Sequence, residues 1–257
     1  MKEGQKLWTR EDLILTINLY CKLPFGKLHS RNPDVIELAN LIHRTPGSVA
    51  FKLVNFASLD PQLKARGIKG ASNVSNLDKE IWNEFFNNWD NLFIESENLY
   101  AKKKKITVDR LYEIDLTDLP KSGEEKERMV KVRTNQIVFR TLVMTNYDFS
   151  CCITGINQPE LLIASHIKPW SQDTTNRLNP KNGLSLNALH DKAFDNGLIT
   201  ITEDYKVKVS SILLKKESTK SIKQNFIQFH NKQITLPKKF MPDPEFLKHH
   251  NHEYFKK

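Results

Sequence analysis

The sequence predicts an α+β protein, in which a helical N-terminal domain is followed by a domain of short strands and a short helix in the order β-β-α-β. Three observations support this prediction. Apolar residues recur at helical spacing from residue 7 to about 94, the composition then becomes basic and polar, and short apolar runs bounded by turn residues follow after residue 150. We expect a helical domain at 1–100, a linker at 101–127 and a second domain at 128–257. In the second domain, "SCCITG" and "ELLIASHI" are expected to form strands, followed by a strand at 183–186, a helix at 188–195 and a further strand. Its expected core is Ile153, Leu162, Ile163, Leu184, Leu186 and Phe194.

Four helices are expected in the N-terminal domain. Thr9, followed three residues later by Asp12, is typical of a capped helix start. Pro33 and Pro46 stand where the first turns of the next two helices begin, because proline is favoured at that position. The fourth helix, over residues 77–93, carries an aromatic stripe at three- and four-residue steps, which favours burial.

The second and third helices form a helix-turn-helix-like pattern, which is one arrangement that proteins use to read DNA. Lys52 and Asn55 lie on the third helix and are therefore the candidate DNA-binding residues of this domain. The same pattern also occurs in helical domains that bind nothing, so a structural role for the pair is the alternative.

The balance of charge favours a polyanionic partner. The chain has 39 Lys and Arg against 30 Asp and Glu, a formal net charge of +9, and such an excess strengthens binding to nucleic acid. A lysine-rich surface without a partner is the alternative. No run of about 18 apolar residues could span a bilayer, and the N-terminus has no apolar stretch of signal-peptide type. Three cysteines make a poor disulfide framework, so we expect a cytoplasmic protein.

Four polar positions after residue 160 suggest phosphodiester chemistry. His166 ends an apolar strand, and Asn182 lies in the polar loop that follows. Asp191 and Asp195 share one face of a short helix, because residues four apart are neighbours there. Two carboxylates in that position suit Mg²⁺ or Mn²⁺. A histidine facing such a cation across a phosphate-sized gap could take a proton from water.

The fragments "CCITG", "LLIASHIKPW" and "RLNPKNGLSLNALHDKAFDNGLITI" occur in this order. Together they resemble the HNH endonuclease domain, a ββα-metal nuclease, in the branch with the pattern C-x-x-T-G, A-x-H-I-x-P-W, N-G-L-x-L and H…F-D. The resemblance covers roughly Arg128 to Phe255. It implies a ββα-metal fold for the second domain and a divalent metal as cofactor.

The resemblance also implies roles for individual residues. His166 corresponds to the general base, and Asn182 to the asparagine that orients it. The metal-binding position on the helix falls at His190 or Asp191, and His190 is thus also a catalytic candidate. Asp195 is a second ligand or an orienting carboxylate. Ser165 stands where many relatives carry an acidic ligand, which leaves the first metal ligand open.

Further expectations concern zinc and DNA. A structural zinc site with four thiolates cannot form from three cysteines, so no structural zinc is expected. Lys168 and Arg177 flank the predicted site and are candidates for DNA phosphate contact, with ordinary solvation as the alternative. The expected partner is double-stranded DNA, without a membrane. A homodimer is possible, since one active site cuts one strand.

These expectations combine into a predicted function, a metal-dependent DNA endonuclease of the kind found in bacterial restriction or defence. One alternative is a DNA-binding regulator whose nuclease domain has lost catalysis. Another is a nuclease that acts on RNA or without sequence specificity.

Overall fold

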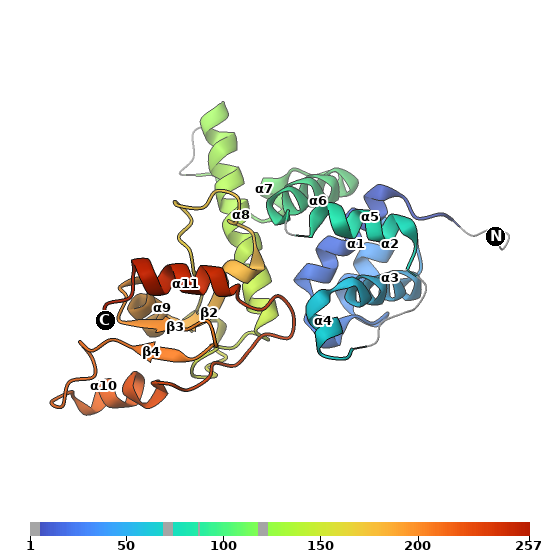
Figure 1. The fold of residues 1–257 in the computed structure, drawn as a ribbon. Coiled ribbons are helices and arrows are strands. Elements are labelled where there is room, and N and C mark those ends of the chain that lie inside the picture. Colours follow the sequence, from blue (N-terminus) through green and yellow to red (C-terminus); the bar gives the residue numbers. More distant parts are fainter. Residues whose placement is uncertain (1–5, 69–73, 87, 118–122) are drawn as a thin grey trace. The chain divides into compact units, whose positions relative to one another are not determined.

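The structure is a computed structural model that describes residues 6–68, 74–86, 88–117 and 123–257 (Figure 1). The chain divides into two compact units, Met1–Val138 and Phe139–Lys257, and each is described by itself. The first is helical in its described parts, and the second combines helices with two small sheets. The predicted α+β class is thereby confirmed. No helix among the described residues is both long and apolar enough to cross a membrane.

The first unit is built around α1 (Arg10–Lys22), whose residues from Asp12 to Asn18 are all buried. Its start is capped as predicted, because the Thr9 hydroxyl accepts from the Asp12 amide at 3.2 Å while Asp12 accepts from the Thr9 amide. The helices that follow α1 in this unit are α2 (Pro33–Leu41), α3 (Pro46–Leu59), α4 (Pro61–Ala65), α5 (Asn76–Phe85), α6 (Trp89–Lys104) and α7 (Val108–Leu111).

The single helix predicted over 77–93 is two helices, α5 and α6. The chain leaves the helix at Phe86, whose backbone is extended at φ −64° and ψ 117°; Asn87 lies outside the described residues. The expected burial of the aromatic stripe is confirmed. Trp82 and Trp89 are 5% and 2% exposed, and the Phe86 ring lies between them, 5.0 Å from the Trp82 centroid and 5.6 Å from that of Trp89.

The segment expected as a linker, 101–127, holds more structure than its composition indicates. α6 continues through Lys104, and α7 follows at Val108–Leu111. Two of its lysines are neutralised, since Lys103 lies 3.0 Å from Glu11 and Lys104 pairs with Glu37. Residues 118–122 lie outside the described part of the chain. The domain boundaries therefore remain a prediction.

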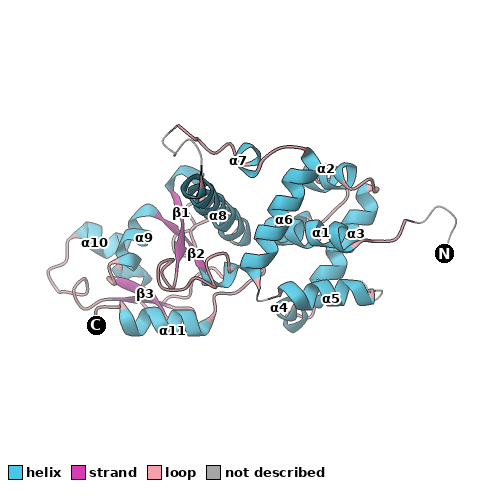
Figure 2. Ribbon diagram, turned by 90° about the horizontal axis from the view of Figure 1, so that it is seen from above, coloured by secondary structure: helices cyan, strands magenta, loops and turns pink. Residues whose placement is uncertain are grey.

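The second unit is organised by an antiparallel hairpin of β1 (Leu162–His166) and β2 (Gly183–Asn187), with His166 opposite Gly183. α9 (Ala188–Asp195) follows β2 directly, as predicted. The hairpin lies between α9 and the C-terminal part of α8 (Glu124–Asn146) (Figure 2). Gly183 permits this packing, because a Cβ there would come within 2.3 Å of the Val143 side chain.

The expectation that "SCCITG" forms a strand is wrong. Cys151 to Thr154 form a tight turn in which the Gly155 amide donates to the Cys151 carbonyl at 2.9 Å. Gly155 has a φ of +75°, which favours glycine. The turn still supports the hairpin, since the Cys152 amide donates to the Ser185 carbonyl at 2.8 Å. The two strands of the ββα unit are thus β1 and β2.

A second hairpin and two helices complete the unit. β3 (Ile199–Ile201) pairs antiparallel with β4 (Val207–Val209), and α10 (Lys220–Asn225) and α11 (Pro244–Glu253) follow. The core includes Leu162, Leu184, Leu186 and Phe194, as the sequence indicates, whereas Ile163 is 36% exposed.

Candidate active site

The end of β1 presents two adjacent side chains to opposite faces of the hairpin, since successive residues of a strand alternate. Ser165 faces α9, where its hydroxyl lies beside the Asp191 carboxyl. His166 faces α8, where its ring stacks on Phe139 with the centroids 3.6 Å apart and the planes at 11°. The expectation that His166 looks directly across a gap at the α9 carboxylates is therefore corrected: β1 itself separates them.

The His166 ring is half-buried and held on three sides. Phe139 covers one face, Trp170 meets it edge-on at 5.5 Å, and its Nε2 lies 3.0 Å from the Arg177 carbonyl oxygen. A carbonyl can only accept, so Nε2 carries the hydrogen, and the neutral ring keeps its lone pair on Nδ1. Burial lowers the pKa of His166, against the bond to Arg177, which raises it. The ring is thus a neutral base near pH 7.

Asn182 does not bond to the His166 ring. Its side chain is buried and holds the loop after β1: Oδ1 accepts from the Lys168 amide at 2.8 Å, and Nδ2 donates to the Lys168 carbonyl at 3.0 Å and the Asn176 carbonyl at 3.4 Å. The Asn182 carbonyl also accepts from the Ile167 amide. Asn182 therefore positions the loop that carries the Arg177 carbonyl, and acts on His166 through it.

Asp191 and Asp195 lie on one face of α9, and Asp191 lies beside Ser165. Burial raises the pKa of both carboxyls, and the Asp191 charge raises that of Asp195 further. Ser165 is 3% exposed. Its buried hydroxyl makes no hydrogen bond of normal geometry with the described residues, although it lowers the pKa of Asp191. Two neighbouring carboxylates and an unsatisfied hydroxyl are a donor set that fits a hard divalent cation.

The described residues contain no group of three or more His, Cys, Asp or Glu side chains arranged to hold a metal ion. If a metal is held by the α9 carboxylates, water or phosphate oxygens would have to supply the rest of its coordination shell. Mg²⁺ is commonly bound in this way, through one or two carboxylates and the phosphates of the substrate.

His190 is not available as a metal ligand in this structure, which corrects that candidate. It is 2% exposed, its Nε2 lies 2.6 Å from the Asn225 carbonyl and its Nδ1 lies 3.2 Å from the Asn187 amide nitrogen. Both ring nitrogens are therefore used. Of the two candidates for the metal-binding position on the helix, His190 and Asp191, the structure favours Asp191.

His190 also contacts a thiol that the sequence indicated to be an inert apolar side chain. Burial alone would raise the pKa of Cys151, but the nearby His190 and Thr154 lower it to about 7. Cys151 is fully buried. The effect of His190 on this cysteine could not be seen in the sequence, because His190 lies on a helix far along the chain.

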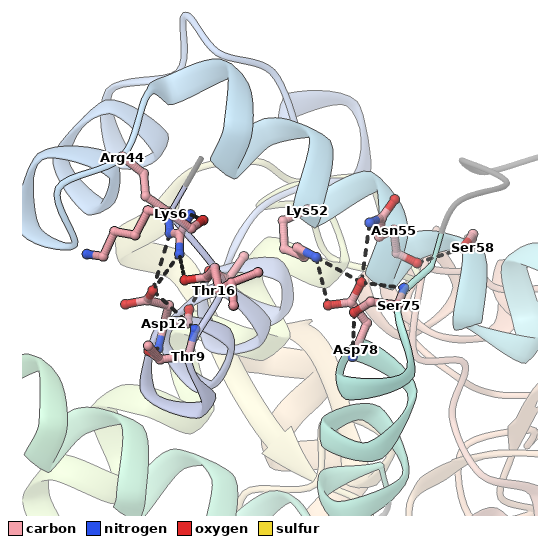
Figure 3. Close-up of polar contacts among 11 residues, drawn as sticks. Lys6, Thr9, Asp12, Thr16, Arg44, Lys52, Asn55, Ser58, Ser75 and Asp78 are labelled. Atoms are coloured by element: carbon pink, nitrogen blue, oxygen red, sulfur yellow. Dashed lines mark hydrogen bonds and ion pairs between the residues drawn. The ribbon is translucent and has the colours of Figure 1, made fainter. Parts of the chain in front are cut away.

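Lys52 and Asn55 do not face a DNA partner, which corrects the prediction for α3. Both are buried, at 6% and 1% exposure. The Lys52 ammonium lies 2.8 Å and 2.9 Å from the two oxygens of Asp78, and the Asn55 amide lies 3.4 Å from one of them (Figure 3). Lys52 also lies over the Trp8 ring. These side chains therefore fasten α3 to α5.

Lys168 and Arg177 lie on the loop between β1 and β2, next to His166. Lys168 pairs with Asp173 at 3.1 Å. Arg177 donates from Nε to the Trp170 carbonyl at 3.1 Å, and its guanidinium lies 5.0 Å from the Trp170 ring centroid. Both are half-buried and brace the loop. The sequence did not predict the contact between the Arg177 carbonyl and His166, because every residue has a backbone carbonyl and its partner cannot be inferred from the residue type.

Comparison with known families is consistent with this geometry. Residues 151–202 match a family model described as HNH endonuclease. The matched segment holds the turn at Cys151, β1, the loop fixed by Asn182, β2, α9 and β3. No curated protein matches the chain.

Proposed function

We propose that this chain is a metal-dependent endonuclease that hydrolyses phosphodiester bonds in double-stranded DNA. The match of residues 151–202 to the HNH endonuclease family supports this proposal. HNH nucleases generally use a divalent metal ion and act on DNA. The observation that carries the proposal is His166, held at the end of β1 through Nε2, while Nδ1 has no hydrogen-bond partner among the described residues. The same strand brings Ser165 beside Asp191 of α9.

In the proposed reaction, Nδ1 of His166 accepts a proton from the attacking water. The Arg177 carbonyl favours the resulting imidazolium, because its hydrogen bond to Nε2 strengthens when the ring becomes positive. Phe139 and Trp170 hold the ring at one angle. The scissile phosphate would lie over the end of β1, where the His166 and Ser165 side chains leave opposite faces of the strand.

Asp191 and Asp195 would hold the divalent metal, with the Ser165 hydroxyl beside them. A bound Mg²⁺ or Mn²⁺ would neutralise charge on the phosphate and on the leaving oxygen. The oxygen-rich donor set favours these two cations over Zn²⁺. No structural zinc is part of the proposal.

The test is cleavage of supercoiled plasmid by wild type, His166→Ala and His252→Ala, with Mg²⁺, with Mn²⁺ and with a chelator. His252 is exposed on α11 and serves as the matched histidine control. We expect wild type and His252→Ala to cleave only with metal, and His166→Ala to lose at least about 100-fold in rate. Equal rates for wild type and His166→Ala would reject the base assignment.

The alternatives give different results in the same assay. A DNA-binding regulator with an inactive nuclease domain would bind the plasmid but leave it intact with every metal. A nuclease for RNA would degrade RNA faster than duplex DNA.

We further propose a role in bacterial restriction or defence, which predicts discrete DNA fragments rather than a smear. Sequencing the ends, from methylated and unmethylated DNA, would define the recognition sequence. Cleavage of both strands at one position would favour a homodimer, and light scattering would measure that state.

A further inference from the structure

The segment from Ser211 to Lys232, which contains α10, carries an unusual excess of exposed positive charge. Its acidic content is a single residue, Glu217, and its lysines are Lys215, Lys216, Lys220, Lys223 and Lys232. All five lysines are exposed. None of them forms an ion pair with the described part of the chain. We call this segment the basic arm.

Several other lysines of the chain are paired with carboxylates. Lys103 and Lys104 pair with Glu11 and Glu37. Lys206 lies 2.6 Å from Asp204, and Lys238 lies 2.8 Å from Asp148. An ion pair at the surface reduces the charge that a distant polyanion experiences, whereas the lysines of the basic arm keep theirs.

The basic arm is fastened to the helix that carries the catalytic carboxylates. His190, the residue before Asp191, bonds to the Asn225 carbonyl at 2.6 Å, and its ring meets Phe226 at 5.4 Å and Phe229 at 5.6 Å. The contact is buried, since Phe226 is 7% exposed. The arm is thus attached to α9 at His190, one residue before Asp191. A ligand bound to the arm would therefore lie at a defined distance from the candidate site.

The arm is also attached to the second hairpin, beside β4 (Figure 1). The Val209 amide donates to Nδ1 of His230 at 3.1 Å, and the amides of Val207 and Asn231 bond to the carbonyls of Lys232 and Val207. The 225–232 stretch is therefore tied to the body of the nuclease unit, and α10, which ends at Asn225, leads directly into it.

We propose that the basic arm is a DNA-backbone binding surface of the nuclease unit. The inference rests on the proposed function for its ligand, duplex DNA, and adds the surface that holds it. Lysine ammonium groups bind phosphates as point charges without reading bases. The arm therefore contributes affinity and orientation at any sequence, and His190 transmits that orientation to α9.

The test is binding of fluorescent duplex DNA by proteins that all carry His166→Ala, so that cleavage plays no part. The arm variant has Lys215, Lys216, Lys220 and Lys223 changed to Ala. The charge-matched control has Lys103, Lys104, Lys206 and Lys238 changed to Ala. Both lower the formal net charge from +9 by the same amount. Thermal unfolding of each variant checks that the fold is kept.

We expect the arm variant to bind at least about tenfold more weakly near 0.1 M salt, and the control to change by less than about threefold. The slope of log affinity against log salt concentration should fall by about 1 for each phosphate contact removed. Equal weakening of both variants would overturn the proposal, because net charge alone would then explain binding. An arm variant that binds DNA normally but loses binding to phosphatidylserine vesicles would overturn it as well.

The readout also separates this inference from the proposed nuclease function. If wild type fails to cleave DNA while the arm variant loses binding, the arm inference stands and the catalytic proposal fails. If wild type cleaves DNA and the arm variant binds DNA normally, the catalytic proposal stands and the arm inference fails.

Discussion

Nε2 of His166 lies 3.0 Å from the carbonyl oxygen of Arg177, eleven residues away in the chain. The partner is a backbone atom, so it depends on the path of the loop between them rather than on the Arg177 side chain. Asn182 fixes that path by bonding to Lys168 on both its amide and its carbonyl. The direction of the proposed base is therefore set by a residue that does not contact it.

The first prediction concerns this indirect control. Asn182→Ala should reduce the rate of DNA cleavage by about 100-fold, because a small displacement of a catalytic group is sufficient for that loss. DNA affinity should change much less, which plasmid cleavage and anisotropy together would measure. Asn196→Ala, which removes a bond to the Lys192 carbonyl at the exposed end of α9, is the control and should keep its rate. Equal losses in the two variants would contradict a positioning role.

The second prediction concerns the carboxylate pair. Asp195→Asn removes a charge that burial and Asp191 both disfavour. The free energy of unfolding without metal should therefore rise, by less than about 1 kcal/mol since Asp195 is exposed to solvent. Calorimetric Mn²⁺ affinity should fall at least about tenfold. Asp204→Asn, in the turn between β3 and β4, should leave that affinity unchanged. An unchanged Mn²⁺ affinity in Asp195→Asn would remove this residue from the metal site.

The third prediction follows from the buried pair of Lys52 and Asp78. Lys52→Met should lower the free energy of unfolding by about 3–5 kcal/mol, because Asp78, which is fully buried, would lose its cation. Adding Asp78→Asn should recover part of the loss. Urea unfolding measures both. If Lys52→Met instead unfolds like wild type and weakens DNA binding, Lys52 faces DNA after all.

The fourth prediction concerns pH. Burial lowers the pKa of His250 to about 4, with a smaller effect of the His249 charge in the same direction and an opposing bond to the Phe194 carbonyl. In the unfolded chain a histidine titrates near 6.5. Between about pH 6.5 and 4 the unfolded chain therefore binds the proton more readily than the folded chain. As the pH is lowered through this range, the free energy of unfolding should decrease by up to about 3 kcal/mol because of this group.

Urea unfolding at pH 7, 6 and 5 would measure this loss, with His250→Gln as the comparison. Glutamine can still donate to Phe194 and accept from Thr200, but it does not titrate. We expect the variant to lose less stability than wild type over this range. Parallel curves for the two proteins would show that His250 titrates normally.

The fifth prediction concerns Gly197, which joins α9 to the C-terminal tail. Its φ is +67°, and a Cβ there would lie 1.9 Å from the Tyr254 carbonyl oxygen. Gly197→Ala should therefore destabilise the protein by more than about 2 kcal/mol. Gly155→Ala has a similar φ of +75° but nothing within 4 Å, and should cost only about 1 kcal/mol. Thermal unfolding of both variants would distinguish the destabilisation caused by the steric clash with Tyr254 from that caused by the positive φ alone.

The sequence by itself determined the features that depend on near neighbours. The cap at Thr9 and the bounds of α9 follow from residues within one helical turn of each other. The motif string around His166 indicated the nuclease family, and the match over 151–202 confirms it.

Tertiary structure decided what each polar side chain does, because its partner lies far away in the chain. His190 was expected at a metal but bonds to Asn225, and Lys52 was expected on DNA but bonds to Asp78. A buried polar group must find a partner or lose several kcal/mol, and the fold supplies that partner from a distant segment. The sequence shows which groups a histidine or lysine side chain can bind. Packing decides whether that side chain bonds within the fold or stays available for a substrate.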